Sequence, residues 1–242
     1  MIPIVQMVKQ SVLLLGVGSF NPPTIMHLRI MELARDFLTK TGKFSVVGGV
    51  LSPVHDAYGK KDLVAGKHRI EMTKLALEHN SWVKLSSWEA AHNTQWTRTR
   101  AVVDYHQNRL NAYLDGSLGE KDPWMPDPQN HSSISCKLVC GADVLETFNT
   151  PGLWTEEDTL TLAQDYGLVV ISREGNDPYR SIYNCDILHE HRANIHVVQE
   201  WLSNEISSTR IRRALRRHES VRYVVPDPVI DYIAGEGLYK TL

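Results

Sequence analysis

Cysteine, long apolar runs and a basic leader are scarce or missing in this sequence, and each absence removes a class of protein. The 242 residues include three cysteines, which form no C-x-x-C pair. Such spacing argues against a disulfide framework or a zinc ribbon and favours buried thiols in a reducing compartment. No apolar run approaches the roughly 18 residues of a membrane helix. The run Val12–Leu15 lacks the basic start of a signal peptide, so we expect no secretory signal and no membrane partner.

An excess of charge of one sign is also absent. Lys and Arg number 26 against 28 Asp and Glu, which gives a net charge of -2. This balance argues against a nucleic-acid partner and an acidic tail, although it leaves room for a local cationic site. With 42% apolar and 22% charged residues, the chain has an ordinary globular composition. A chain of this size buries enough surface to fold without a disulfide or structural metal.

Short apolar runs alternate with amphipathic stretches along the chain. This alternation is typical of β-α units around a parallel sheet. We predict an α/β fold, a doubly wound, Rossmann-like parallel sheet with helices on both faces, formed by residues 1–242 as a single domain. The expected strands are 12–17, 44–51, 82–85, 137–140, 168–172 and 195–198. The expected helices are 25–40, 67–78, 94–114, 142–148, 156–165, 181–191, 207–217 and 228–234.

The segment 115–135 interrupts the alternation. It contains three prolines and two glycines and has few apolar residues. Such a composition is typical of loops. We therefore predict a mobile surface insertion here.

The turn after the first strand does not match the common phosphate-binding motifs. A dinucleotide G-x-G-x-x-G motif that starts at Gly16 would need glycine at position 21, where Asn21 stands. The Walker pattern fails because Gly59-Lys60 is followed by Lys61 and position 54 is valine.

The same turn has its own pattern, Gly18-x-Phe20-x-Pro22-x-Thr24-x-x-His27. Gly18 lets backbone amides approach a ligand, and proline stiffens the turn. With Thr24 as N-cap, His27 lies beside the free N–H groups at the positive end of a helix. The pattern favours phosphate binding. The alternative is a first-turn histidine that faces solvent.

A second cationic segment lies near the other end, Ser207-Ser208-Thr209-Arg210-Ile211-Arg212-Arg213. Hydroxyls and free amides at a helix start, followed by guanidinium groups, suit a polyphosphate. A nuclear-import or nucleic-acid patch and a solvated helix face are the alternatives. The net charge argues against the first, and the placement of the hydroxyls argues against the second.

The six tryptophans exceed what a core of this size requires. Trp82 and Trp88 flank an expected strand and are interpreted as structural. Trp96 and Trp154 lie beside polar segments, where they could stack on a nucleobase or pyridinium ring or serve in packing. The sequence has no paired carboxylates, H-E-x-x-H or G-x-S-x-G pattern, so no covalent nucleophile is visible.

These segments together resemble the eukaryotic nicotinamide/nicotinic acid mononucleotide adenylyltransferases, within the nucleotidyltransferase superfamily that has a T/H-x-x-H turn. The resemblance covers nearly the whole chain outside its ends and 115–135. It depends on the following segments: Gly18 to His27, Ser52-Pro53-Val54, Asp56 to Lys61, Cys140 to Asp143, Leu153-Trp154, Asn194 to Val197, and Ile206-Ser207-Ser208-Thr209-x-x-Arg212.

The resemblance implies an enzyme that joins the adenylyl group of ATP to nicotinamide mononucleotide or nicotinic acid mononucleotide. The products would be NAD or deamido-NAD and pyrophosphate, and Mg²⁺ would be required. It implies catalytic roles for His27 and Arg212. It assigns ATP binding to Gly18, Ser19, Phe20, His27, Ser207, Thr209, Arg210, Ile211 and Arg212. It assigns mononucleotide or NAD binding to Gly18, Ser19, Tyr58, Lys60, Trp96, Thr99, Gly141, Asp143, Leu153, Trp154, Glu200 and Asn204.

Two positions depart from the family pattern. Arg98 stands where the family often has an acidic residue, and Pro23 replaces an aliphatic residue. Arg98 puts the local substrate contacts in doubt. The insertion also lacks the basic import run of a nuclear member, which favours the cytoplasm while a nuclear location stays open.

Two further expectations concern the metal ion and the assembly. We see no ligand set for a permanent metal, so Mg²⁺ is expected to arrive with ATP. We also expect a homo-oligomer. Another adenylyl- or cytidylyltransferase of the superfamily and an additional chaperone-like role remain as alternatives.

Overall fold

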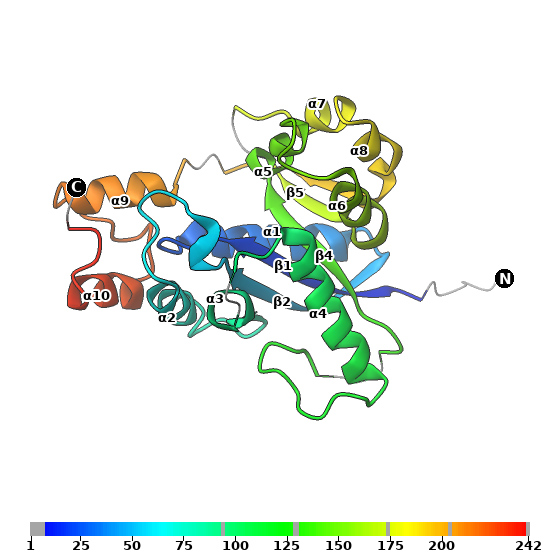
Figure 1. The fold of residues 1–242 in the computed structure, drawn as a ribbon, viewed down its shortest axis with the longest axis horizontal. Coiled ribbons are helices and arrows are strands. Elements are labelled where there is room, and N and C mark those ends of the chain that lie inside the picture. Colours follow the sequence, from blue (N-terminus) through cyan, green and yellow to red (C-terminus); the bar gives the residue numbers. More distant parts are fainter. Residues whose placement is uncertain (1–7, 93–94, 128–130, 173–174, 203–204, 241–242) are drawn as a thin grey trace.

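A six-stranded parallel sheet forms the centre of the computed structural model (Figure 1). The structure describes residues 8–92, 95–127, 131–172, 175–202 and 205–240. The strands lie in the order β3-β2-β1-β4-β5-β6. Their bounds are β1 Gln10–Gly18, β2 Phe44–Pro53, β3 Val83–Leu85, β4 Ser135–Gly141, β5 Leu168–Ile171 and β6 Ile195–Val198. The predicted doubly wound parallel sheet is therefore confirmed.

Strand β1 has apolar side chains on both faces. Leu13 and Leu15 contribute to one hydrophobic cluster, whereas Val12 and Leu14 contribute to the other. All four are fully buried. A strand covered on both faces needs a continuous apolar run, which explains why this strand was clear from the sequence.

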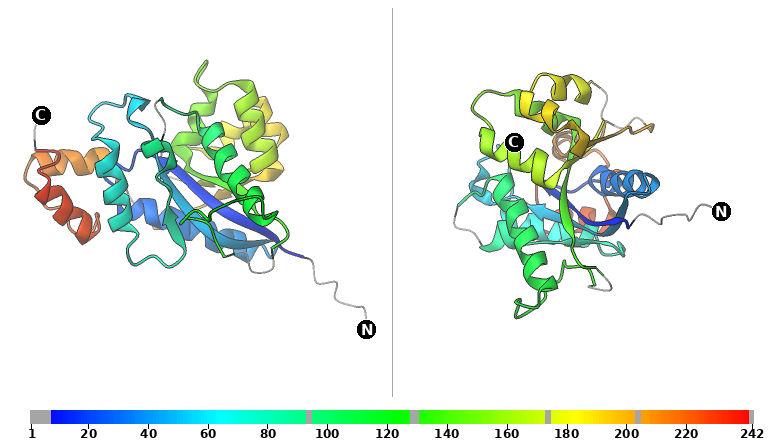
Figure 2. Two further views of the ribbon diagram at one scale, coloured as in Figure 1. Left: turned by 60° about the horizontal axis from the view of Figure 1, so that its bottom comes forward. Right: turned by 90° about the vertical axis from the view of Figure 1, so that its right-hand side faces the viewer.

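Helices cover the two faces of the sheet. Helix α1 lies on one face, and α4 lies on the other (Figure 2). The helix bounds are α1 Ile25–Lys40, α2 Gly66–Ala76, α3 Trp88–His92, α4 Thr99–Leu114, α5 Ala142–Glu146, α6 Glu156–Thr161, α7 Pro178–Tyr183, α8 Asp186–Glu190, α9 Ser208–Arg216 and α10 Asp227–Gly235. Within the described ranges, no helix is long and apolar enough to cross a membrane.

A third hydrophobic cluster joins α2, α9 and α10, which lie together at one end of the molecule (Figure 1). Met72 of α2, Ile211 of α9 and Ile233 of α10 belong to it. Ile211 is thereby buried. This cluster fixes α9 close to the turn that follows β1, where the hydroxyl of Ser208 donates to the carbonyl oxygen of Pro22 at 2.9 Å.

Two of the predicted helices were wrong in extent. The helix predicted over 94–114 begins at Thr99, because Arg98 has extended backbone angles and serves as its N-cap. The helix predicted over 181–191 is two short helices, since Cys185 is extended (φ -118°, ψ 110°). The first of them starts at Pro178 after Asp177, whose carboxylate accepts two backbone N–H groups. An Asp-Pro pair is a recognised helix start.

The segment 115–135 differs from the expected surface loop. Trp124, Met125 and Ile134 are at most 5% exposed and belong to the main hydrophobic cluster. Arg109 of α4 also forms an ion pair with Asp122 at 2.8 Å. The described part of the segment thus contributes to the core, and its mobility stays a prediction.

Candidate functional site

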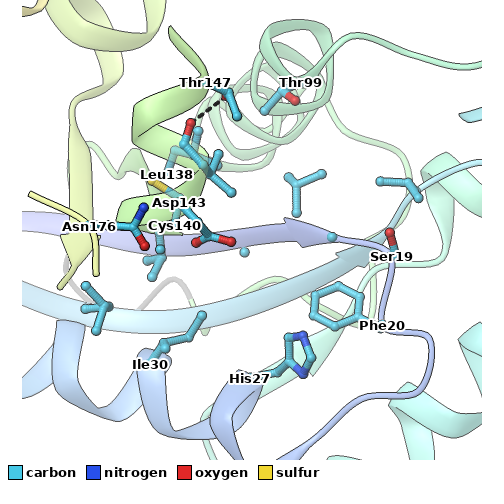
Figure 3. A pocket seen from close by; sticks show the side chains of 18 of the residues that line it. Ser19, Phe20, His27, Ile30, Thr99, Leu138, Cys140, Asp143, Thr147 and Asn176 are labelled. Atoms are coloured by element: carbon cyan, nitrogen blue, oxygen red, sulfur yellow. Dashed lines mark hydrogen bonds between the residues drawn. The ribbon is translucent and has the colours of Figure 1, made fainter. Parts of the chain in front are cut away.

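A cavity of about 1220 Å³ opens at the carboxyl ends of the strands. It lies where the strand order reverses, between β1 and β4, which is the usual ligand position in doubly wound sheets. Residues from the ends of β1, β4 and β5 and from the starts of α1, α4 and α9 line it. Figure 3 shows part of the lining, with His27 beside Phe20 and with Asp143 and Thr99 from other elements.

His27 occupies the first turn of α1 and faces the cavity (Figure 3). Its Nδ1 accepts the backbone N–H of Thr24 at 2.9 Å. The proton of the neutral ring is therefore on Nε2. Burial lowers the pKa of His27 to about 4, and the charge of Lys60 acts in the same direction. At neutral pH the side chain is an uncharged hydrogen-bond donor.

The turn between β1 and α1 has unusual backbone geometry. Phe20 adopts φ 44°, in the left-handed region that non-glycine residues rarely occupy. Asn21, which is 2% exposed, secures the turn from inside. Its Nδ2 donates to the carbonyl oxygen of Asp62 at 2.7 Å, and its Oδ1 accepts the hydroxyl of Tyr239 at 2.6 Å. Contacts with distant segments thus support a conformation that local preference disfavours.

Helix α9 presents its N-terminus to the same cavity. Ser207, Ser208 and Thr209 all line it. Ser207 is the N-cap and its Oγ accepts the backbone N–H of Arg210 at 3.3 Å. The first N–H groups of a helix have no partner within the helix. At the start of α9 the N–H groups of Ser208 and Thr209 can therefore bind an anion, whereas in α1 the N–H groups of Ile25 and His27 already donate to the carbonyl oxygens of Val224 and Thr24. Helix α1 contributes the positive end of its dipole and the His27 side chain to the same space.

Aromatic side chains line another part of the cavity. Trp96 is 44% exposed and lies against Tyr58, with ring centroids 6.0 Å apart. Trp154 stacks on Phe148 at 4.2 Å, and its Nε1 donates to Oγ1 of Thr147. One face of Trp154 is therefore used in packing. Both tryptophans lie where a planar ring could stack.

Charged groups of both signs lie along the cavity. Lys60 and Asp143 line it, and both act electrostatically on His27. The carboxylate of Asp143 folds over Gly141, where an added Cβ would lie only 2.4 Å from Oδ1. Glu200 has a side chain only 8% exposed and forms an ion pair with Arg29 at 3.2 Å.

The comparisons with known proteins agree with this arrangement. Residues 15–214 match the family described as Cytidylyltransferase-like. The chain is 44% identical over 254 residues to nicotinamide/nicotinic acid mononucleotide adenylyltransferase 1 of Bos taurus, which covers 96% of this chain and 90% of that protein. It is 41% identical over 234 residues to the nicotinamide/nicotinic acid mononucleotide adenylyltransferase of Arabidopsis thaliana, covering 97% and 92%.

The chain belongs to the nicotinamide/nicotinic acid mononucleotide adenylyltransferases. A solved structure, the Plasmodium falciparum nicotinic acid mononucleotide adenylyltransferase complexed with NaAD, has the same fold. The superposition of the two structures has a TM-score of 0.63 at 15% sequence identity, and it covers 96% of this chain and 98% of that chain.

Most residues that the resemblance to these adenylyltransferases implied lie together around the cavity. The turns that contain His27 and Thr209, which are 182 positions apart in the sequence, both line it. The residues brought together are Gly18, Ser19, Phe20, His27, Tyr58, Lys60, Trp96, Thr99, Gly141, Asp143, Leu153, Trp154, Glu200, Ser207 and Thr209. Asn204 lies outside the described residues.

Three members of the predicted ATP set do not line this cavity. Arg210 forms an ion pair with Glu205 on the outer surface, and the side chain of Ile211 is buried in the third cluster. Arg212 is 5% exposed, and its Nη1 donates to the carbonyl oxygen of Asn21 at 2.9 Å. Arg212 therefore connects α9 to the β1–α1 turn. Its Nε–H has no partner among the described residues, so the guanidinium keeps donor capacity.

Sequence reasoning missed two acidic residues of the cavity wall, Glu89 and Asp158. Glu89 is 0% exposed, and burial raises its pKa to about 8. Its position soon after β3 was a usable signal, because the carboxyl ends of parallel strands meet at one edge. Asp158 lies inside helix α6, and no sequence signal marks it.

Proposed function

We propose that the protein transfers the adenylyl group of ATP to nicotinamide mononucleotide or nicotinic acid mononucleotide. The products are the dinucleotide and pyrophosphate. One observation carries this proposal: the His27 turn and the Ser207–Thr209 turn line one cavity that also contains exposed aromatic rings. This combination suits a polyphosphate and a planar base in the same space.

The reaction is an in-line displacement. A phosphate oxygen of the mononucleotide attacks the α-phosphorus of ATP, the new P–O bond forms, and the bond to the β-phosphate bridging oxygen breaks. Because both reactants are anions, positioning and charge stabilisation account for the rate. The Nε2–H group of His27 donates to a phosphoryl oxygen, Lys60 reduces repulsion, and the two helix ends add fixed positive potential.

Magnesium is proposed to arrive with ATP. No group of three or more His, Cys, Asp or Glu that could hold a metal ion occurs in the part of the chain that the structure describes. Four acidic residues line the cavity, Glu89, Asp143, Asp158 and Glu200. Glu200 and Asp158 form ion pairs with arginines and burial keeps Glu89 largely protonated, whereas Asp143 acts electrostatically on His27, where a phosphate is expected. A single carboxylate plus substrate phosphates is a usual environment for Mg²⁺, so Asp143 is the residue that would hold it. When bound, the ion neutralises charge on the triphosphate.

The test is an assay with ATP, Mg²⁺ and each mononucleotide, in which pyrophosphate is followed and the dinucleotide is identified by mass. The wild type should form both products. The variant His27→Ala should lower kcat by about 10²–10³ at saturating substrates, which is the effect of removing a transition-state donor. Its control is His189→Ala, since His189 is exposed on α8 and outside the cavity lining.

Two results would refute the proposal. One is release of pyrophosphate only with another acceptor, such as a pantetheine phosphate, or only from CTP. The other is the absence of turnover with any acceptor. Full activity of His27→Ala would refute only the role proposed for His27 and would leave the proposed reaction standing.

Other properties belong to the proposal as predictions. We keep the cytoplasm as the expected location and a homo-oligomer as the expected assembly. The additional chaperone-like role also stays a prediction. It would be supported if the inactive His27→Ala variant suppressed the aggregation of a client protein.

A further inference from the structure

The aromatic part of the cavity contains a positively charged side chain. Arg98 lines the cavity between Trp96 and Thr99, and its side chain is 59% exposed. Nη1 of Arg98 donates to Oδ2 of Asp158 at 3.1 Å. A guanidinium has five N–H groups, so most of its donor capacity is not used by this bond.

The acidic partner is less accessible than the cation. The side chain of Asp158 is only 10% exposed. Its Oδ1 lies 3.8 Å from Arg100, and its backbone N–H is capped by Oγ1 of Thr155. Arg100 is itself paired with Oδ2 of Asp104 at 2.9 Å and Oε1 of Glu157 at 2.7 Å, so the close partner of Asp158 is Arg98. Because the Arg98 side chain is 59% exposed and that of Asp158 only 10%, the guanidinium is the more accessible charge in this part of the cavity.

The start of helix α4 reinforces this field. Arg98 is the N-cap of α4, and its first turn contains no acidic residue. Thr99, the next residue, also lines the cavity. The N-terminus of a helix of this length has a partial positive charge. The wall beside Trp96 and Trp154 therefore favours a negatively charged group.

The two mononucleotides differ at one group. If the phosphate lies at His27, the pyridine ring extends toward Trp96 and Trp154. The ring substituent is then a neutral carboxamide in one mononucleotide and a carboxylate in the other. Both accept a hydrogen bond, but a bond between guanidinium and carboxylate is charge-assisted and about twice as strong.

We propose that Arg98 is a specificity-determining residue that favours the acid mononucleotide by donating to its ring carboxylate. This inference rests on the proposed function, because it assumes that the ring binds between Trp96 and Trp154. The preferred substrates of this site would be pyridine mononucleotides with a carboxylate on the ring.

The experiment compares kcat/KM for the two mononucleotides in the wild type and in Arg98→Gln. The variant should lower kcat/KM for the acid form about tenfold more than for the amide form, which corresponds to the loss of one charge-assisted bond. Arg98→Lys keeps the charge and should retain part of the preference. If Arg98 had a purely structural role, the substitution would change kcat/KM for both substrates by the same factor and leave their ratio unaffected.

Arg100→Gln is the matched control. Arg100 belongs to the same ion-pair group, with Oδ2 of Asp104 at 2.9 Å, but does not line the cavity. Its substitution should leave the ratio unchanged. An unchanged ratio in Arg98→Gln, or an equal change in Arg100→Gln, would overturn the inference.

Calorimetry separates this inference from the proposed function. Binding of each mononucleotide to the wild type and to Arg98→Gln gives the same ratio without turnover. If no mononucleotide is adenylylated, the proposed function fails, and the binding ratio still decides on Arg98. If both are adenylylated and the ratio does not respond to Arg98, only this inference fails.

Discussion

Glu89 has a carboxyl group whose environment differs strongly from water. It is 0% exposed, and its Oε1 accepts only a long hydrogen bond of 3.4 Å from the backbone N–H of His55. Its Oε2 has no partner among the described residues. Burial raises the pKa of Glu89 to about 8, against the charge of Arg69 and the His55 bond. At neutral pH the group is largely protonated.

This environment makes stability depend on pH. The folded pKa lies above the ordinary glutamate value of 4.5, so between these two values the native state binds more protons than the unfolded state. The free energy of unfolding therefore falls as pH rises from about 5 to 8, by at most roughly 1.4 kcal/mol per pH unit from this group. Glu89→Gln should remove this loss. Its melting temperature should exceed that of the wild type by a margin that grows over this pH range.

Thermal melts at several pH values measure this margin. Glu78→Gln is the control, because Glu78 is exposed just after α2. A difference between Glu89→Gln and the wild type that is constant with pH would show that the Glu89 carboxyl is not protonated in the native state.

Helix α9 shows how one element serves both stability and the site. Its apolar side, including Ile211, packs against α2 and α10. Its first turn faces the cavity, and two polar side chains connect it to the β1–α1 turn. Ser208 donates to the carbonyl oxygen of Pro22, and Arg212 to that of Asn21. The position of the Ser207–Thr209 turn therefore depends on contacts outside the cavity.

Removal of the Arg212 contact should affect both the stability of the fold and the binding of ATP. Arg212→Ala leaves a buried carbonyl oxygen without its partner, which costs about 1–3 kcal/mol in the free energy of unfolding. It should also raise the KM for ATP, because α9 loses a connection to the turn that contains His27. Denaturant unfolding and steady-state kinetics measure the two effects. Arg213→Ala on the exposed side of α9 is the control, and equal behaviour of the two variants would contradict this role of Arg212.

The accuracy of the sequence predictions varied among the elements for physical reasons. The strands β1, β4 and β5 were predictable because they are buried on both faces and therefore need nearly continuous apolar runs. The N-cap Thr24 was predictable because a cap acts within one turn of chain, whereas Ser207, predicted as the first residue of its helix, is the N-cap of α9. The break at Cys185 and the start of α4 after Arg98 are changes of backbone angle at single residues, and neither residue is a preferred N-cap type.

At the scale of the whole molecule, the arrangement of the sheet brings the site together. With β1 and β4 adjacent at the centre, the turns after both strands open into the same cavity. The family resemblance implied this meeting, because it assigned Gly18 and Ser19 after β1 and Gly141 and Asp143 after β4 to nucleotide binding. The sequence could not predict that Arg212 is buried, or that Trp124 of the 115–135 segment enters the core, since both depend on contacts between distant segments.

We expect the His27 turn and the Ser207–Thr209 turn to bind one nucleotide together. A crystal structure with a non-hydrolysable ATP analogue and Mg²⁺ tests it most directly. We predict phosphate oxygens within hydrogen-bond distance of Nε2 of His27 and, in the same molecule of analogue, of the backbone N–H groups of Ser208 or Thr209. An analogue whose phosphates contact only one of the two turns would contradict the account.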